Sequence, residues 1–412
     1  SKKTAWIPYL RPNLSQAYCE VNMEQGAPPP LKKIGWFVHY WNLIRLPARQ
    51  FAPLLQYENV NDNNCSLSLL PMVFYSPGLG GTSETYSYQT LSLAAKGFVV
   101  VVVEHGDGSL AIMPRKDGSA FRRSDDKVVQ EWENGNHERH IRSRRAMTEY
   151  RSEEIIAATR YMMELNRTNI PELRGVNFVG KLDLEDIHYM GHSFGGASVL
   201  YAALKNSANN NNDSSFKIRS IVTHDVMADW IPDSTRLSLF DGERLKDSKT
   251  NHTYWTKTMT TTMSDSHHKG RGKQSSSFHP SSSIHNFDLF LLFSHQWESN
   301  NWGGVEVLQD MYKRNVFGRQ RRIGKNNDND GQQQQLSLSR VEVVDSAHHI
   351  EFSDLCMITP TWLARMVNLT GAESPLKTAK DIHTRTLNFL MEVRGQERTS
   401  AILSNNNNHQ TK

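Results

Sequence analysis

The segment Gly191-His192-Ser193-Phe194-Gly195 has the G-x-S-x-G pattern that exposes a nucleophilic serine. Residues 186–190 before it read as a short buried strand, and the small residues at 196–204 after it favour a helix. This order predicts a sharp strand-to-helix turn that lifts the serine hydroxyl above a sheet, with glycines leaving room for a strained backbone. The pattern therefore predicts a serine hydrolase, and a plain Gly-Ser loop is the alternative.

A nucleophilic serine needs a general base, and in such hydrolases a histidine supplies it after the last strand of the sheet. His348 and His349 follow the apolar residues 341–344, which read as such a strand. Spacing alone does not choose between the two histidines.

The base in turn needs a carboxylate that fixes its tautomer. Asp225 closes the strand expected after the elbow helix, and Glu298 follows the next strand, a more usual place for the acid. Asp229 is a third candidate. All three acids remain open at this point.

Two backbone N–H groups are expected to bind the developing oxyanion. One belongs to Phe194, the residue after the nucleophile, and the other to a glycine turn after the first main strand. Leu79 in Gly78-Leu79-Gly80 is well placed for the second.

Strands alternating with helices predict an α/β fold with a mostly parallel, doubly wound sheet. Strands are expected at 71–75, 97–105, 186–190, 218–223, 287–293 and 339–344, and helices at 86–95, 139–166 and 196–204. The valine-rich run at 97–105 is expected in the middle of the sheet. We expect a single domain over residues 1–400.

Three polar segments interrupt this alternation, near 206–215, 241–285 and 319–335, and are expected to be disordered insertions. Residues 401–412 are expected to be a disordered tail. His267, His268, His279 and His285 in the middle insertion are irregularly spaced, without alternating acidic or cysteine ligands, so no metal site is predicted there.

An aromatic helix is predicted at 35–46, ending before Pro47. One face of this helix would carry Trp36, Phe37, Tyr40, Trp41 and Ile44. Periodicity favours packing on the core, and contact with a lipid surface is the alternative.

Bulk composition excludes several classes of protein. The 412 residues are 38% hydrophobic and carry a net charge of only +4, which is too little to indicate nucleic-acid binding. The basic stretches at 139–145 and 319–325 read as solvated faces. No apolar run reaches the length of a membrane span, and three scattered cysteines provide no disulfide framework.

Short motifs in order along the chain resemble the platelet-activating factor acetylhydrolase family, calcium-independent phospholipases that cleave short or oxidised sn-2 acyl chains. The matching pieces lie at 5–8, 42–46, 73–80, 97–107, 140–142, 191–197 and 349–354. The resemblance implies an α/β-hydrolase fold and a serine esterase that needs no metal or cofactor. It also implies a phospholipid substrate and peripheral contact with a membrane or lipoprotein surface.

The resemblance also implies choices that spacing leaves open. It favours Asp225 over Glu298 as the acid, and His349 over His348, because the family histidine precedes a Phe-x-Asp pattern by three residues. It implies Leu79 as the second oxyanion donor, and it favours lipid contact for the aromatic helix.

The chain departs from the family at three places. Pro77 replaces a family histidine, but the N–H of Leu79 is unaffected. The residues after Asp225 are one position out of register, which keeps Asp229 open. The chain starts at Ser1, after the family's first strand pair, so we expect a domain without those strands, and secretion and cytoplasmic membrane association are equally open.

The sequence thus predicts a serine esterase acting on the sn-2 acetyl or short-chain ester of platelet-activating factor and related phospholipids. A general carboxylesterase or lipase acting on small esters is one alternative. A non-catalytic lipid-binding protein with a hydrolase fold is another.

Overall fold

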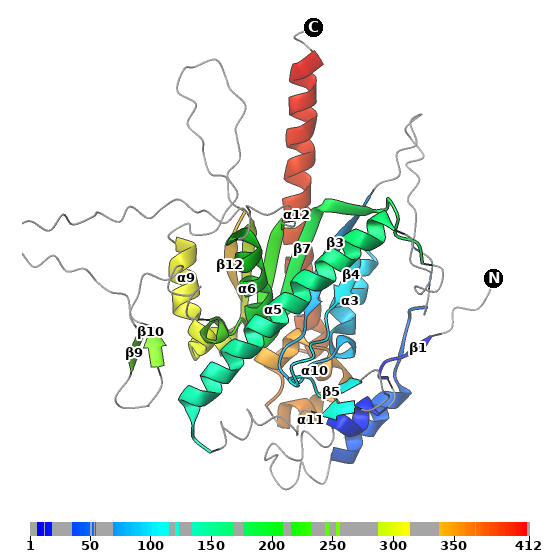
Figure 1. Cartoon of the computed structure of the whole chain (residues 1–412). Helices are drawn as coiled ribbons and strands as arrows, with labels where there is room; N and C mark the ends of the chain where they lie inside the picture. The colour runs from blue at the N-terminus through cyan, green and yellow to red at the C-terminus, as the bar shows by residue number, and fades with distance from the viewer. Residues whose placement is uncertain are drawn as a thin grey trace, which may run out of the picture.

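Six parallel strands form the central sheet of the computed structural model, in the order β12-β11-β8-β7-β3-β4 (Figure 1). The strands are β3 (Leu70–Ser76), β4 (Val99–Val102), β7 (Leu182–His192), β8 (Ser220–His224), β11 (Asp288–Ser294) and β12 (Arg340–Val344). The structure describes residues 6–11, 13–18, 35–49, 52, 54, 69–114, 120–122, 134–168, 176–208, 216–232, 244–246, 253–255, 287–313, 338–366 and 368–409. The predicted parallel α/β sheet is confirmed.

Helices cover both faces of this sheet. The α-helices are α3 (Ser87–Ala94), α5 (His137–Arg167), α6 (Phe194–Ala208), α8 (His295–Ser299), α9 (Val305–Lys313), α10 (Leu355–Ile358), α11 (Thr361–Met366) and α12 (Pro375–His409). Short 3-10 helices are η1 (Gly35–Leu43), η2 (Ser83–Tyr86), η5 (Ala228–Trp230), η6 (Trp302–Gly304) and η7 (His349–Phe352). No helix within the described ranges is long and apolar enough to cross a membrane.

The hydrophobic core forms two layers because alternate side chains of a strand point to opposite faces of the sheet. Met72 and Phe74 of β3 pack in the layer under α5, α6 and α9, whereas Val73 and Tyr75 pack under α3 and α12. Both layers are buried, which explains why the strands read as continuous apolar runs.

Three pairs of short strands lie outside the sheet. They are antiparallel and comprise β1 (Ile7–Pro8) with β2 (Arg45–Leu46), β5 (Ile112–Pro114) with β6 (Ala120–Arg122), and β9 (Arg244–Lys246) with β10 (Thr253–Trp255). The last pair corrects the prediction that 241–285 is disordered throughout, since the strand residues of this segment, such as Thr253 and Tyr254, favour a paired extended backbone. The insertions at 206–215 and 319–335 lie almost wholly outside the described residues.

Two further predictions need correction. Strand β4 pairs only with β3 among the described strands, so it lies at an edge of the sheet and not in the middle. The prediction failed because an apolar run indicates burial of the faces of a strand and not the number of its hydrogen-bonded neighbours. Helix α12 continues to His409 through part of the predicted tail, since each added residue gains a hydrogen bond once a helix has formed.

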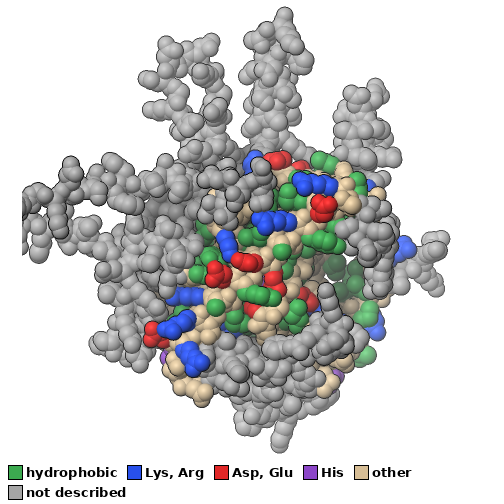
Figure 2. Space-filling model, in the orientation of Figure 1, with side chains coloured by type: hydrophobic (Ala, Val, Ile, Leu, Met, Phe, Trp, Pro, Cys, Tyr) green, Lys and Arg blue, Asp and Glu red, His purple; other side chains and the backbone are tan. Residues whose placement is uncertain are grey.

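The long helix predicted at 139–166 is confirmed as α5, which crosses the front of the molecule in Figure 1. On this face, basic and acidic side chains are interspersed along α5 (Figure 2). Arg142 is exposed and approaches Glu138 at 3.9 Å, whereas Arg144 is buried. The basic stretch at 139–145 is therefore divided between solvent and core.

Candidate active site

Ser193 occupies a sharp turn between β7 and α6. Its φ of 56° lies in the left-handed region, which side chains other than glycine adopt only with strain. Its N–H donates to the carbonyl of His224 at 2.8 Å, tying the turn to the neighbouring strand. A Cβ at Gly191 would lie 2.4 Å from the carbonyl oxygen of Gly195, and one at Gly195 would lie 1.9 Å from that of Ser76. Both glycines are therefore required by the close approach of backbones.

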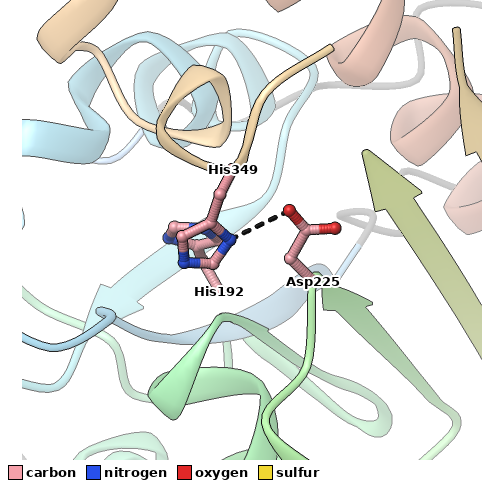
Figure 3. A group of neighbouring side chains, drawn as sticks. All are labelled: His192, Asp225 and His349. Atoms are coloured by element: carbon pink, nitrogen blue, oxygen red, sulfur yellow. Dashed lines mark hydrogen bonds and ion pairs between the residues drawn. The ribbon is translucent and has the colours of Figure 1, made fainter. Parts of the chain in front are cut away.

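The register of the sheet brings a serine, a histidine and an aspartate together. His192 pairs with His224 at the ends of β7 and β8, so Ser193 and Asp225 follow side by side. Nε2 of His349 lies 3.1 Å from Oγ of Ser193, and its Nδ1 lies 2.9 Å from Oδ2 of Asp225. Figure 3 shows the imidazole of His349 directed at the Asp225 carboxylate. Because the carboxylate accepts the Nδ1 proton, Nε2 is free to accept a proton from Ser193.

Asp225 is fully buried and receives two hydrogen bonds from one residue. The N–H of Ser294 donates to Oδ1 at 2.6 Å, and the hydroxyl of Ser294 donates to Oδ2 at 2.6 Å. Burial raises the pKa of Asp225, and these two hydrogen bonds act in the opposite direction by stabilising the carboxylate. Ser294 thus favours the charged form that orients His349.

Aromatic rings hold the imidazole of His349 from both sides. The ring of Trp297 stacks on it at 4.1 Å between centroids with a 16° interplanar angle, and the ring of His192 lies at 4.5 Å. The N–H of His349 donates to Oε1 of Gln296 at 3.0 Å. Burial lowers the pKa of His349 to about 3, so the imidazole is neutral and able to act as a base at neutral pH.

The other candidates lie apart from this cluster. His348 places Nδ1 3.3 Å from the carbonyl of Asn368 and is the N-cap residue of η7. Glu298 lies in α8, and the carbonyl of Asp229 in η5 accepts a hydrogen bond from Arg145 at 3.1 Å. Within the described residues, the acid in contact with His349 is Asp225.

The two residues predicted to donate to the oxyanion lie in turns that approach each other, since a Cβ at Gly78 would lie 3.3 Å from the carbonyl oxygen of His192. Leu79 lies in the turn after β3, and Phe194 begins α6. Within the described residues neither backbone N–H meets an acceptor, whereas the N–H of Gly78 donates to the hydroxyl of Tyr86 at 3.0 Å. That hydroxyl also lies 2.9 Å from Nδ1 of His192, to which its own proton can be donated. Tyr86 therefore joins the Gly78 turn to the nucleophile turn.

A metal ion is the other chemistry that this cluster could suggest. The possible ligand atoms of His192, Asp225 and His349 lie within 4.8 Å of one another. Nδ1 of His349 is already bonded to Asp225, and Nδ1 of His192 to Tyr86. His267, His268, His279 and His285 of the middle insertion lie outside the described residues.

The aromatic helix differs from the prediction. The segment forms the 3-10 helix η1 and then β2, and its side chains contribute to a third core cluster with Tyr9, Leu14 and Ile112. Trp41 is buried there, and Tyr40 and Ile44 pack against it. This corrects the lipid-facing role implied for Trp41 and agrees with periodicity, which favoured the core. The side chains of Trp36 and Phe37 lie outside the described residues.

Sequence reasoning missed the residues that support the cluster. Ser294 and Trp297 follow the strand predicted at 287–293, and Tyr86 begins the helix predicted at 86–95. No spacing rule connects Tyr86 with His192, 106 positions away. Such contacts arise from the fold and carry no local sequence signal.

Comparisons with known proteins support the motif resemblance. A family model described as platelet-activating factor acetylhydrolase, isoform II, matches residues 56–228. The platelet-activating factor acetylhydrolase of Canis lupus familiaris is 28% identical over 208 residues, covering 48% of this chain and 43% of that protein. That of Bos taurus is 30% identical over 139 residues, covering 32% of this chain and 31% of that protein. The predicted family resemblance is confirmed, although each match spans less than half of the relative.

Among solved structures, a ferulic acid esterase from Streptomyces cinnamoneus is similar, with a TM-score of 0.50. At 14% identity it covers 95% of this chain and 78% of that protein. This likeness confirms the α/β-hydrolase fold and nothing finer.

Proposed function

Because residues 56–228 match the platelet-activating factor acetylhydrolase family, we propose that this chain is a serine esterase acting on phospholipids with a short sn-2 acyl chain. The observation that carries the proposal is the hydrogen-bonded chain from Ser193 through His349 to Asp225. Its chemistry is acyl transfer, and it requires a nucleophile, a base and an orienting acid in this order.

His349 accepts and returns one proton in each half of the reaction. As the oxygen of Ser193 attacks the sn-2 carbonyl, Nε2 of His349 takes its proton, and Asp225 stabilises the resulting imidazolium. The N–H groups of Leu79 and Phe194 bind the oxyanion, a role worth about 3 kcal/mol for each donor. The sn-2 oxygen of the lysophospholipid leaves with the proton from His349. Water, deprotonated by the same imidazole, then attacks the acyl-serine, and the oxygen of Ser193 takes that proton back as the carboxylic acid is released.

A series of phosphatidylcholines with sn-2 chains from acetyl to palmitoyl, assayed in chelator, tests the substrate class. We expect fast cleavage of the acetyl ester, a steep fall with chain length, and loss of about 10⁴-fold or more in Ser193→Ala. Equal turnover of all chain lengths, or turnover of soluble aryl esters only, would point instead to a general carboxylesterase. Binding without turnover would indicate a non-catalytic lipid-binding protein.

Exposed apolar side chains support peripheral contact with a lipid surface. Leu43 ends η1 with 79% of its surface exposed, and Trp362 and Met366 of α11 are 63% and 58% exposed. Helix α10, which precedes α11, packs against the same cluster as Trp41. In place of the buried Trp41, we assign lipid contact to this exposed trio.

Replacing Trp362 by alanine tests this assignment. We expect Trp362→Ala to lower turnover of vesicle-bound substrate by about tenfold, since an exposed tryptophan anchors in the interface, and to leave soluble esters unaffected. Tyr161→Ala removes a similarly exposed aromatic ring from α5 and is the control. Equal losses on vesicles and soluble esters would contradict the assignment.

A further inference from the structure

We propose that Arg151 is a positioning residue that holds the two halves of the oxyanion site in register, an inference that rests on the proposed esterase function. Arg151 lies in the middle of α5, and its side chain is fully buried. Burying a guanidinium costs several kcal/mol of desolvation energy, and only a complete set of hydrogen-bond and charge partners offsets this cost. Those partners belong to the turn that carries Leu79.

The first contact of Arg151 is with the backbone of that turn. Its Nη1 donates to the carbonyl of Pro77 at 3.1 Å, two residues before Leu79. Its Nη2 donates to the hydroxyl of Ser109, and the carbonyl of Ser109 accepts the N–H of Gly80 at 2.7 Å. The residues on both sides of Leu79 are therefore anchored to one side chain, which limits rotation of the Leu79 N–H.

The second contact is with the residue that supplies the other donor. The guanidinium carbon of Arg151 lies 3.9 Å from the centroid of the Phe194 ring, a cation–π distance. Phe194 is fully buried and follows Ser193 directly. Its ring and its backbone N–H belong to the same residue, so a contact that fixes the ring also limits movement of the N–H. One planar group thus touches the structures that carry both oxyanion donors.

Asp107 fixes the orientation of this planar group. Nε of Arg151 donates to Oδ2 of Asp107 at 2.7 Å, while Oδ1 accepts the N–H of Ser109 at 3.0 Å. Burial acts to raise the pKa of Asp107, but the charge of Arg151, together with His105 and the hydrogen bonds from Ser109 and Arg151, holds the pKa below its usual value. The Asp107 carboxylate is ionised at neutral pH and balances the guanidinium charge, so Arg151 acts through placement of the donors and adds little net charge.

A matched pair exists at the other end of the sheet. Nε of Arg394 donates to Oδ2 of Asp186 at 2.7 Å, and its guanidinium carbon lies 5.1 Å from the Phe98 ring centroid. Asp186 lies in β7 six residues before the end of the strand, away from the nucleophile turn. Arg394→Gln removes the same kind of interaction without touching the oxyanion site.

The test compares Arg151→Gln, Arg151→Lys and Arg394→Gln, with a soluble aryl acetate as substrate and a trifluoromethyl ketone as an inhibitor that forms a tetrahedral adduct. Displacing a donor by about 1 Å costs on the order of 10²-fold in rate, so we expect kcat of Arg151→Gln to fall by about that factor at an unchanged KM. The inhibition constant should rise in parallel. Lysine restores the positive charge but not the planar set of N–H donors of the guanidinium, so kcat of Arg151→Lys should lie between those of Arg151→Gln and the wild type.

Arg394→Gln should lower the melting temperature and leave kcat unchanged. Wild-type kcat and inhibition in a folded Arg151→Gln would overturn the inference and leave the esterase function standing. An equal fall of kcat in Arg394→Gln would also overturn the inference, since the loss of activity would then reflect lower stability of the protein. A wild-type protein inert towards every ester would overturn both proposals.

Discussion

At the scale of single residues, Ser193, His349 and Asp225 depend on neighbours that hold strained or buried groups in place. Ser193 and Asp225 both have φ in the left-handed region, at 56° and 45°. Such backbone persists only where the surrounding structure determines it, and here the N–H groups of Ser193 and Asp225 donate to carbonyls of β8 and β11. Small changes next to these residues should therefore alter rate more than stability.

The Tyr86 hydroxyl provides a first prediction. Tyr86→Phe leaves the N–H of Gly78 and Nδ1 of His192 without their shared partner. Loss of one buried hydrogen bond costs about 1–3 kcal/mol, so we expect kcat to fall by about tenfold. Steady-state kinetics on an aryl acetate measure this. Tyr88→Phe, whose ring packs on His383, is the control and should retain full activity, and equal rates in the two variants would contradict the prediction.

The pH dependence of kcat/KM provides a second. Burial lowers the pKa of His349 to about 3, below the ordinary value of about 6.5, so the base is neutral throughout the usual assay range. We expect the acid limb of the profile to lie below pH 6.5. Samples returned to pH 7.5 after each acid incubation separate titration from unfolding. An acid limb centred above pH 7 would show that His349 is charged when substrate binds.

At the scale of elements, the turn between β7 and α6 was predictable because its requirements are local. Two glycines, a serine and the apolar run before them occupy consecutive positions, and the structure places them as expected. The position of β4 was not predictable, because a strand's neighbours are chosen by residues far away in the chain. The same holds for Ser294, whose bonds to Asp225 join positions 69 apart.

Two glycine-to-alanine substitutions compare the space around α12 with the space around the turn between β7 and α6. Gly395 lies in α12, where an added methyl group would meet open space, so Gly395→Ala should stabilise the protein by about 1 kcal/mol. Gly195→Ala would place Cβ 1.9 Å from the carbonyl oxygen of Ser76 and should lower both the melting temperature and kcat severely. Thermal unfolding and an aryl acetate assay measure both effects. A fully active Gly195→Ala would mean that β3 and the nucleophile turn do not approach this closely.

At the scale of the whole molecule, many histidines are held neutral in the interior. Burial lowers the pKa of six of them: His105, His188, His192, His224, His349 and His383. The unfolded chain binds more protons than the folded chain below about pH 6.5, so stability is present above this pH and is lost as the pH falls. Burial also raises the pKa of Asp354, to about 7, and the pKa values of Asp183 and Asp225, which acts in the opposite direction but involves fewer groups.

We therefore expect the melting temperature to fall progressively between pH 7 and pH 5, as differential scanning calorimetry would measure. The physical reason is that each buried histidine must be protonated on unfolding. A melting temperature that is constant or rises over this interval would show that the interior histidines are already charged or exposed in the folded protein.

The most direct test of the central claim is the reaction of Ser193 with a fluorophosphonate, located by mass spectrometry of the digested protein. If Ser193 is the nucleophile activated by His349 and Asp225, a single phosphonyl adduct should appear on the peptide that contains Ser193. Labelling should be lost in Ser193→Ala and strongly slowed in His349→Ala. An adduct on another residue, or labelling that is unchanged in His349→Ala, would contradict the account.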